Sequence, residues 1–432
     1  MTQKTLNDIA WEQIFVKYDV INKIANDGFF EIKSKQINEF RESRLMAKFD
    51  HYINLPKTFR DNNLSILPIS RSAYVIGQFQ THNPVSYQDI EPLPVDPLNF
   101  ESINHTNLYS ESSSLLYAYN SGIINNLVEE DVALTLNGRM SSDKFKFDIR
   151  NSINDSSFSV DVENAQIEID AGFESDSHLI LVEAKNTQVD DFLIRQIYYP
   201  YRLWSDKVNK DILNVFMTYS NDIFSFFVYE FKKENEYNSL NLIKQVDYLV
   251  AEEYIGLDDV IELYENTDVL PEPKNIPFPQ ADKFERIIDL LGLLYENNLT
   301  REDITSNYEF DVRQTSYYTS AGIYLGLINK YYNRKDKELI YCLTDLGKNI
   351  MKKNYQQKYL SIIQIILEHD IFNYVFETSL DNGDVPSVPE IIELMSDKKL
   401  DERYVHTTIK RRAQTIRGWI NWIFKLTRTK YD

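Results

Sequence analysis

Four prolines fall within nine consecutive positions, from Pro271 to Pro279. Because proline fixes a backbone dihedral and lacks an amide hydrogen, this density excludes helix and central strand and predicts a stiff, extended connector. Helical and strand-like patterns alternate before the connector, whereas helical patterns dominate after it. We therefore expect an α/β (α+β) region with a mixed sheet, a linker at 266–282 and a mainly α-helical C-terminal region.

Composition narrows the class of protein. Of the 432 residues, 43% are hydrophobic, which is enough for a sizeable core, and Cys342 is the only cysteine. One thiol and six scattered histidines offer neither an intramolecular disulfide nor a zinc-type cluster. No apolar run approaches the roughly 18 residues of a membrane helix, and the N-terminus lacks the pattern of a signal peptide. These features predict a soluble, cytoplasmic protein without a membrane partner.

Charge is unevenly distributed along the chain. The 66 acidic residues outnumber the 46 Lys and Arg residues, and the net charge of -20 argues against a protein that coats nucleic acid nonspecifically. The stretch from Arg403 to Lys430, however, contains eight basic residues and no acidic one. Because phosphate contacts are local, an acidic protein with such a basic face can still bind DNA.

Residues 101–265 have the pattern of an α/β core. A serine-rich run opens a helix, or a broken pair of helices, over 109–130. The elements expected after it are strands over 144–149, 160–170 and 179–185, a helix over 190–204 that bends at Pro200, and strands over 213–219 and 223–232. Residues 1–100 are expected to be a mixed α/β extension that helps DNA recognition; the alternative is that they only complete the sheet.

Acidic residues and one lysine gather at the ends of two of these strands. Segment 166–170 alternates polar and apolar residues, so Asp170 points away from the core-facing isoleucines. Glu183 and Lys185 share one face of the later strand, and all three side chains meet if the two strands pair as a hairpin. Two adjacent carboxylates stay ionised only beside a cation, and Mg²⁺ suits them. The lysine could orient or help deprotonate an attacking water, or stabilise charge on a phosphate.

A solvated strand face of mixed charge is the alternative interpretation of this cluster. An acid two positions before a lysine also occurs at Glu31-Lys33 and Glu230-Lys232. The context of Glu183 favours a functional site, because the apolar residues 179–182 place the charged pair where a buried strand emerges.

Asp170, twelve intervening residues and then Glu183-Ala184-Lys185 resemble the active site of the PD-(D/E)XK nucleases. The expected α-β-β-β-α-β order is similar to the core of that superfamily, although Ile169 occupies the proline position of the motif. The resemblance implies that Asp170 and Glu183 bind Mg²⁺ and that Lys185 assists the water that hydrolyses a phosphodiester bond. It covers residues 101–235, about a third of the chain.

Further residues extend the resemblance. Members of the superfamily often add an acid from the preceding helix, which points here to Glu111 as a catalytic residue; the alternative is a first-turn acid favoured by the helix dipole. Gln196 and Tyr199 are similar to a Gln/Tyr pair of some members, with a different spacing. Among the members of this superfamily, the whole chain most resembles a type II restriction endonuclease.

Residues 283–358 resemble a winged helix-turn-helix. The sequence predicts three helices, the first over 282–298 and the third from 311, and then two short strands within 331–343 around a basic tip. The resemblance implies two sets of DNA contacts: Arg313, Gln314 and Tyr317 on a recognition helix, and Arg334, Lys335 and Lys337 on the wing. Winged helices also serve as protein-interaction modules, which is the alternative.

Residues 359–432 are expected to be a second helical DNA-binding unit. On its last helix, Lys410, Arg411 and Arg417 fall outside an apolar stripe formed by Ile409, Ile416, Trp419, Ile420 and Ile423. We expect these cations to contact phosphate; the alternative is a solvated basic face.

These patterns and resemblances together predict a Mg²⁺-dependent, sequence-specific endonuclease that cleaves double-stranded DNA and leaves a 3′-hydroxyl. A cognate DNA methyltransferase would be its genetic partner, and a homodimer is expected at least during cleavage. Two alternatives stay open: a non-enzymatic winged-helix DNA-binding regulator, and a repair or junction nuclease with the same active site.

Overall fold

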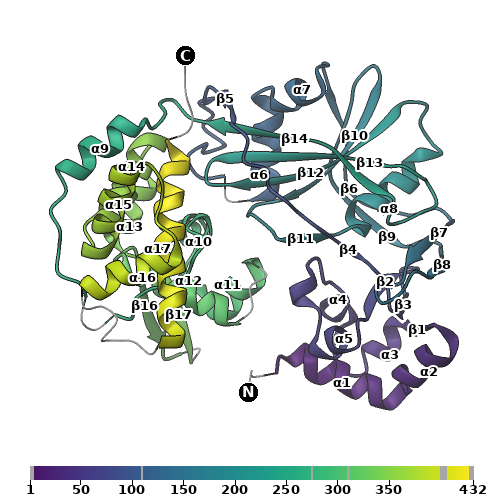
Figure 1. The fold of residues 1–432 in the computed structure, drawn as a ribbon. Coiled ribbons are helices and arrows are strands. Elements are labelled where there is room, and N and C mark those ends of the chain that lie inside the picture. Colours follow the sequence, from purple (N-terminus) through teal and green to yellow (C-terminus); the bar gives the residue numbers. More distant parts are fainter. Residues whose placement is uncertain are drawn as a thin grey trace.

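The computed structural model describes residues 4–108, 110–273, 276–308, 312–335, 337–398 and 406–427. They form a mixed α/β protein with an N-terminal domain, a central region built on a mixed sheet, and a mainly helical C-terminal domain (Figure 1). Within these residues, no helix is both long enough and apolar enough to span a membrane.

The N-terminal domain, residues 4–76, has its own hydrophobic core. Its elements are α1 (Leu6–Tyr18), α2 (Val20–Asp27), β1 (Phe29–Lys33), α3 (Ser34–Ile37), α4 (Ser43–Met46), η1 (Tyr52–Asn54), α5 (Lys57–Asp61), β2 (Ser65–Pro68) and β3 (Ala73–Gly77). The three strands form an antiparallel sheet in the order β1-β3-β2. Trp11, Ile14 and Phe59 are completely buried in the core between the helices and this sheet.

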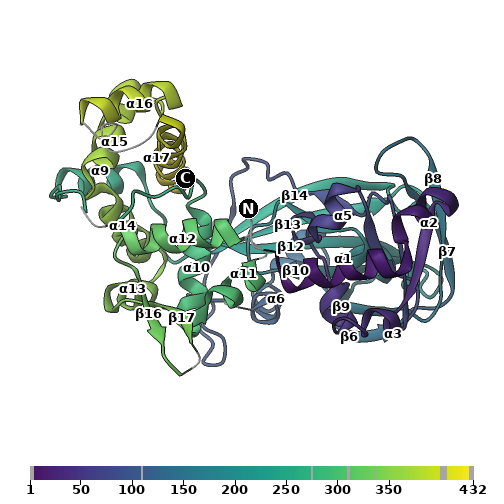
Figure 2. The same ribbon diagram turned by 90° about the horizontal axis from the view of Figure 1, so that it is seen from below.

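The central region is built on a seven-stranded sheet in the order β5-β14-β13-β12-β10-β9-β6. Figure 2 shows the strands from β14 to β6 in this order. Its elements are β4 (His82–Pro84), β5 (Leu93–Val95), α6 (Glu111–Asn120), α7 (Ile123–Val128), β6 (Ala133–Ser141), β7 (Phe145–Arg150), β8 (Ser157–Val162), β9 (Gln166–Glu174), β10 (His178–Lys185), β11 (Asp191–Leu193), α8 (Arg195–Ser205), β12 (Asp211–Ser220), β13 (Ile223–Phe231) and β14 (Leu240–Val250). β10 runs antiparallel to β9 and parallel to β12. Helices α6 and α7 pack on one face of the sheet, and α8 with the β7–β8 hairpin packs on the other.

The structure corrects the expected strands at one edge of this sheet. We expected 144–149 to be the first strand of the central sheet after the helices. That segment instead lies in β7 and pairs with β8 in a separate two-stranded sheet. The strand that follows α7 in the central sheet is β6. The expected strand 160–170 is divided between β8 and β9. Sequence patterns miss β6 because it is an edge strand with mostly exposed side chains, so apolar residues do not mark it.

The two helical expectations in this region have different outcomes. The helix expected over 109–130 is a broken pair, because Gly122 adopts a positive φ of 77° between α6 and α7. The helix expected over 190–204 begins only at Arg195, since residues 191–193 form β11 and pair with β4.

The C-terminal domain packs as one body. Its elements are α9 (Leu257–Glu265), α10 (Glu285–Glu296), β15 (Leu299–Thr300), α11 (Arg301–Tyr308), α12 (Val312–Tyr324), β16 (Ile328–Asn333), β17 (Glu338–Leu343), α13 (Asp345–Met351), α14 (Tyr355–Leu367), α15 (Asp370–Asn382), α16 (Val388–Asp397) and α17 (His406–Leu426). β15, β17 and β16 form an antiparallel sheet, and the last two strands are the expected hairpin. One hydrophobic cluster extends from Leu249 to Leu426, so the units expected at 283–358 and 359–432 share a core.

The proline-rich connector lies against this core. Its described residues within 266–282 form neither helix nor strand, as expected, but Phe278 is buried beside the ring of Phe372. The indole nitrogen of Trp419 donates to the carbonyl of Ala281 at 2.7 Å. A Cβ at Gly418 would lie 2.1 Å from the carbonyl oxygen of Asp282, so glycine permits this close approach of α17 to the connector.

Candidate active site

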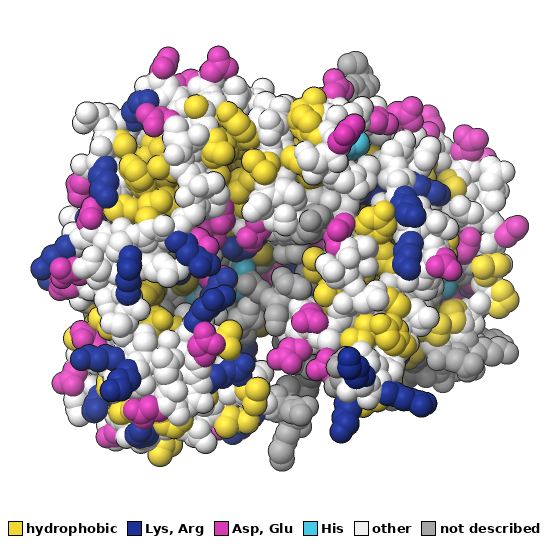
Figure 3. Space-filling model, turned by 180° about the vertical axis from the view of Figure 1, so that it is seen from behind, with side chains coloured by type: hydrophobic (Ala, Val, Ile, Leu, Met, Phe, Trp, Pro, Cys, Tyr) yellow, Lys and Arg dark blue, Asp and Glu magenta, His cyan; other side chains and the backbone are white. Residues whose placement is uncertain are grey.

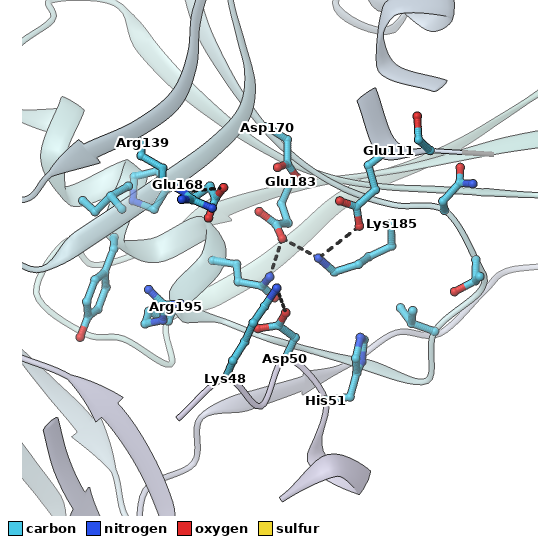
Figure 4. A pocket seen from close by; sticks show the side chains of 18 of the residues that line it. Lys48, Asp50, His51, Glu111, Arg139, Glu168, Asp170, Glu183, Lys185 and Arg195 are labelled. Carbon is cyan, nitrogen blue, oxygen red and sulfur yellow. Dashed lines mark hydrogen bonds and ion pairs between the residues drawn. The ribbon is translucent and has the colours of Figure 1, made fainter. Parts of the chain in front are cut away.

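A pocket of about 480 Å³ opens where β9 and β10 meet α6 and α8 (Figure 4). Charged side chains dominate its lining: Lys48, Asp50, Glu111, Arg139, Glu168, Asp170, Glu183, Lys185 and Arg195. All four residues expected to be catalytic, Asp170, Glu183, Lys185 and Glu111, therefore lie in one pocket.

The pairing of β9 with β10 ends beside two acids. The last paired residues are Val182 and Ala171; Glu183 follows Val182 on β10, and Asp170 precedes Ala171 on β9. The backbone amide of Ala184 donates to Oδ2 of Asp170 at 2.9 Å and fixes that carboxylate. Both acids consequently occupy adjacent strands at the same end of the sheet.

The side-chain alternation of β9 changes at the same point. Ile167 and Ile169 pack in the cluster beneath α8, whereas Ala171 and Phe173 pack in the cluster beneath α6 and α7. A regular strand would place all four side chains on one face. Asp170 therefore lies where the strand exchanges its faces.

Lys185 and Gln196 converge on one oxygen of Glu183. The Nζ of Lys185 lies 2.7 Å from Oε1 of Glu183 and 3.8 Å from Oε1 of Glu111, and the side-chain amide of Gln196 donates to the same Glu183 oxygen. The side chains of Glu183 and Lys185 are 9% and 12% exposed. Of the Gln/Tyr pair noted in the sequence, Gln196 reaches the acids, whereas the hydroxyl of Tyr199 donates to the carbonyl of Pro68.

The surroundings change the proton affinity of these groups. Burial raises the pKa of Glu183 to about 8, and the charge of Asp170 adds to this effect against the opposing charge of Lys185. Burial alone would lower the pKa of Lys185, but the carboxylates of Glu183, Glu111 and Asp50 raise it above its ordinary value. Burial likewise raises the pKa of Glu111. The lysine is therefore held protonated, while Glu183 needs a further positive charge to be fully ionised at neutral pH.

A hard divalent cation fits this need. Mg²⁺ is usually held by one or two carboxylates, and water and substrate oxygens complete its shell. Asp170 and Glu183 provide two carboxylates on adjacent strands. In the described part of the chain, no three His, Cys, Asp or Glu side chains converge as a ready metal cluster. Two carboxylate donors would leave the other coordination positions of such an ion to water and substrate oxygens.

Several residues of the pocket are not evident from the sequence. Lys48, Asp50 and His51 enter it from the N-terminal domain, and Arg139 and Arg195 enter from β6 and α8. Burial alone would raise the pKa of Asp50, but Lys185, Lys48 and Arg195 together hold it below its ordinary value. In the sequence, the charged residues around Lys48 lie beside a hydrophobic run. Their spacing does not indicate that they lie next to the strands of the central sheet.

The residues expected to contact DNA lie on the C-terminal domain. Gln314 and Tyr317 are on α12, while the side chain of Arg313 lies outside the described residues. The hydroxyl of Tyr317 accepts a hydrogen bond from Nη1 of Arg411 at 3.4 Å. The faces of α12 and α17 that carry the expected DNA contacts therefore lie next to each other. Lys410 is exposed, and Nε of Arg417 donates to the carbonyl of Pro386 at 3.2 Å.

The hairpin tip presents the remaining cations. Arg334, Lys335 and Lys337 are exposed where β16 turns into β17. Lys and Arg side chains gather over this hairpin at the lower right of the molecule in Figure 3. The cations of the hairpin tip, α12 and α17 are far in sequence from most residues of the pocket. Their domain nevertheless reaches the pocket through Leu293, which lines it.

Three family models match the chain, and each describes a domain of unknown function: DUF6996 over residues 8–76, DUF6997 over residues 77–249 and DUF7226 over residues 286–428. No curated protein and no solved structure matched the chain. All three matched segments contribute to the pocket, through Lys48 in the first, Glu183 in the second and Leu293 in the third. The pocket is thus the point at which the three matched domains meet.

Proposed function

We propose that the protein is a Mg²⁺-dependent DNA endonuclease with a PD-(D/E)XK active site, and that a type II restriction enzyme is its class. The observation that carries the proposal is that Asp170 and Glu183 adjoin the last residue pair of β9 and β10, with Lys185 bonded to Glu183. The chain order of α6/α7, β6, β9, β10, α8 and β12 supports it, because these elements follow the α-β-β-β-α-β order of that superfamily. We also propose the cytoplasm as its location.

The proposed reaction is hydrolysis of one phosphodiester bond. The oxygen of a water bonds to phosphorus, the bond from phosphorus to the 3′ oxygen breaks, and a proton from the water balances the 3′-hydroxyl that leaves. A bound Mg²⁺ would activate the water and neutralise charge on the phosphate. Asp170 and Glu183 would hold it.

Lys185 acts in this scheme as a hydrogen-bond donor. Because the surrounding carboxylates raise its pKa, its ammonium group keeps its protons near neutral pH. It can therefore orient the water or bind a phosphate oxygen, but it is poorly suited to remove a proton. Glu111, 3.8 Å from its Nζ, helps to fix its position.

The C-terminal domain is proposed to select the DNA. The order α10-β15-α11-α12-β16-β17, with its three-stranded antiparallel sheet, is the order of a winged helix-turn-helix. Base contacts would come from α12, phosphate contacts from Lys410, Arg411 and Arg417 on α17, and wing contacts from the β16–β17 tip. A cognate methyltransferase as genetic partner and a homodimer during cleavage complete this proposal.

Cleavage of plasmid and sequenced genomic DNA in Mg²⁺ tests the proposal. Wild-type protein should give discrete fragments with 3′-hydroxyl ends, whereas Asp170→Asn, Glu183→Gln and Lys185→Met should not cut yet should still bind DNA in Ca²⁺. Glu174→Gln is the matched control, since Glu174 lies on the same strand β9 but pairs with Lys210. Binding without cleavage by wild type would instead support a DNA-binding regulator, and cleavage of branched DNA alone would support a repair nuclease.

A further inference from the structure

The catalytic pocket of the central region is completed by a segment of another domain. We propose that Lys48 is a catalytic residue that stabilises the charge of the scissile phosphate, and that Asp50 is the residue that positions Lys48. This inference rests on the proposed phosphodiester hydrolysis and extends it, since it makes the N-terminal domain part of the catalytic machinery.

The segment that carries both residues is fixed on its C-terminal side by the central region. The ring of His82, from β4, donates from Nε2 to the carbonyl of Phe49 at 3.0 Å. The backbone amide of Tyr52 donates to Oδ1 of Asp191, from β11, at 3.1 Å. Because β4 and β11 pair with each other, both contacts come from one small sheet beside the pocket.

The N-terminal domain fixes the same segment from the other side. The indole nitrogen of Trp11 donates to the carbonyl of Met46 at 2.9 Å, and Trp11 is completely buried. Phe49 is 5% exposed and packs in the core of this domain. Lys48 and Asp50 therefore project from a backbone that is held before substrate arrives, which is a requirement for efficient catalysis by electrostatic stabilisation.

Asp50 is a buried carboxylate surrounded by cations. It is 6% exposed, and its carboxylate lies 3.6 Å from Nζ of Lys48 and faces the same space as Glu183 and Lys185 (Figure 4). Removing a carboxylate from water costs several kcal/mol unless nearby cations compensate it. Its ion pair with Lys48 gives Asp50 the means to position that ammonium group.

Lys48 has the opposite exposure. Its side chain is 74% exposed although its Nζ is tethered to Asp50, which places the ammonium group at the mouth of the pocket. There it can meet an oxygen of a ligand bound to Asp170 and Glu183. A phosphate gains negative charge in the transition state of hydrolysis, so a fixed cation at this place binds the transition state more strongly than the substrate.

This placement predicts an effect on rate and not on affinity. The cations on α17 and at the hairpin tip are available to bind phosphates of the uncleaved DNA, and so to set its affinity. Lys48 would add one contact, at the phosphate that reacts. Under single-turnover conditions with saturating enzyme and Mg²⁺, Lys48→Ala should lower the cleavage rate by about 10²-fold. The dissociation constant for the same duplex in Ca²⁺ should change less than about 2-fold, and Lys48→Arg should recover part of the rate. Lys23→Ala on α2, outside the pocket, is the matched control.

A double-mutant cycle tests the role of Asp50. If Asp50 acts by positioning Lys48, then Asp50→Asn should slow wild type but should slow Lys48→Ala much less, because the interaction has already been removed. Thermal unfolding of each variant shows whether the fold is intact. A purely structural role of Asp50 would instead lower both rates equally.

Three outcomes are distinguishable. If wild type does not cleave DNA at all, the proposed function is wrong and this inference falls with it. If wild type cleaves and folded Lys48→Ala cleaves at the same rate, only the inference is overturned. If Lys48→Ala loses affinity in proportion to rate, Lys48 is a ground-state phosphate contact, and the assignment as a catalytic residue is likewise overturned.

Discussion

The Nζ of Lys358 lies 2.6 Å from Oδ2 of Asp222, and the two side chains are only 3% and 8% exposed. Lys358 is on α14 of the C-terminal domain, whereas Asp222 is in the turn between β12 and β13 of the central sheet. Next to it, the hydroxyl of Ser220 donates to Asp289 of α10 at 2.9 Å. Buried polar contacts thus join the C-terminal domain to the turn that follows a strand of the central sheet.

Breaking this ion pair should destabilise the whole protein. Lys358→Met leaves the Asp222 carboxylate buried without its cation, which is expected to lower the free energy of unfolding by about 3–5 kcal/mol. Urea unfolding measures the change. Lys398→Met is the matched control, because the Lys398–Asp370 pair has a similar 2.8 Å separation but is 33% and 41% exposed, and its loss should cost about 0–1 kcal/mol. If the two substitutions lowered the free energy of unfolding equally, the buried Lys358–Asp222 pair would contribute no more to stability than an exposed ion pair.

The same interface should make stability depend on pH. Burial raises the pKa of Asp289 to about 8; Glu285 adds to the rise, while the hydrogen bond from Ser220 and the charge of Arg286 oppose it. A carboxyl group whose pKa is higher in the folded than in the unfolded protein binds more protons when folded, so the free energy of unfolding falls as pH rises from about 4 to 8. Asp289→Asn cannot lose a proton, and its unfolding temperature relative to wild type should therefore increase over this range. A difference that stays constant with pH would contradict this assignment.

The basic face of α17 should contact phosphate if the protein binds DNA as proposed. Neutralising Lys410, Arg411 and Arg417 should weaken binding to specific and nonspecific duplex by similar factors. The slope of log K against log salt should decrease by about 0.9 for each phosphate that the variant no longer neutralises. Fluorescence anisotropy over a salt series measures it. An unchanged slope would mean that this face contacts solvent or another protein.

Packing against the connector should make Gly418 intolerant of a side chain. An alanine in a helix interior normally stabilises by about 1 kcal/mol relative to glycine. Here, however, the added Cβ would lie 2.1 Å from the carbonyl of Asp282, so Gly418→Ala should destabilise by about 1–3 kcal/mol. Gln414→Ala, at an exposed position of the same helix, is the control and should leave the unfolding midpoint nearly unchanged. Stabilisation by Gly418→Ala would show that the connector moves away easily.

Local patterns were sufficient for much of the fold. The alternation around Asp170 and the apolar run before Glu183 predicted two strands, and the structure pairs them. The stripe of Ile416, Trp419 and Ile420 is buried while Lys410 is exposed, as the helical period predicted. These features depend on residues close in sequence, where side-chain periodicity reports burial directly.

The rest of the site could not be predicted because it depends on contacts between distant segments. Lys48 and Asp50 reach the pocket through contacts between two domains, among them those of Phe49 with His82 and of Tyr52 with Asp191. The edge strand β6 is mostly exposed and carries little apolar alternation. Nothing in the residue pattern indicated that the connector would pack against α17, because proline density reports stiffness and not what the segment touches.

The connector has a consequence for how large ligands fit. It packs into the C-terminal core through Phe278, and that core is joined to the central sheet by the Lys358–Asp222 pair and the Ser220–Asp289 contact. A ligand held by both α12 and the pocket must therefore span one set distance. If the C-terminal domain selects DNA as proposed, the protein would also select for distance: among duplexes with the same recognised surface, it would cut those whose reacting phosphate lies at the matching distance.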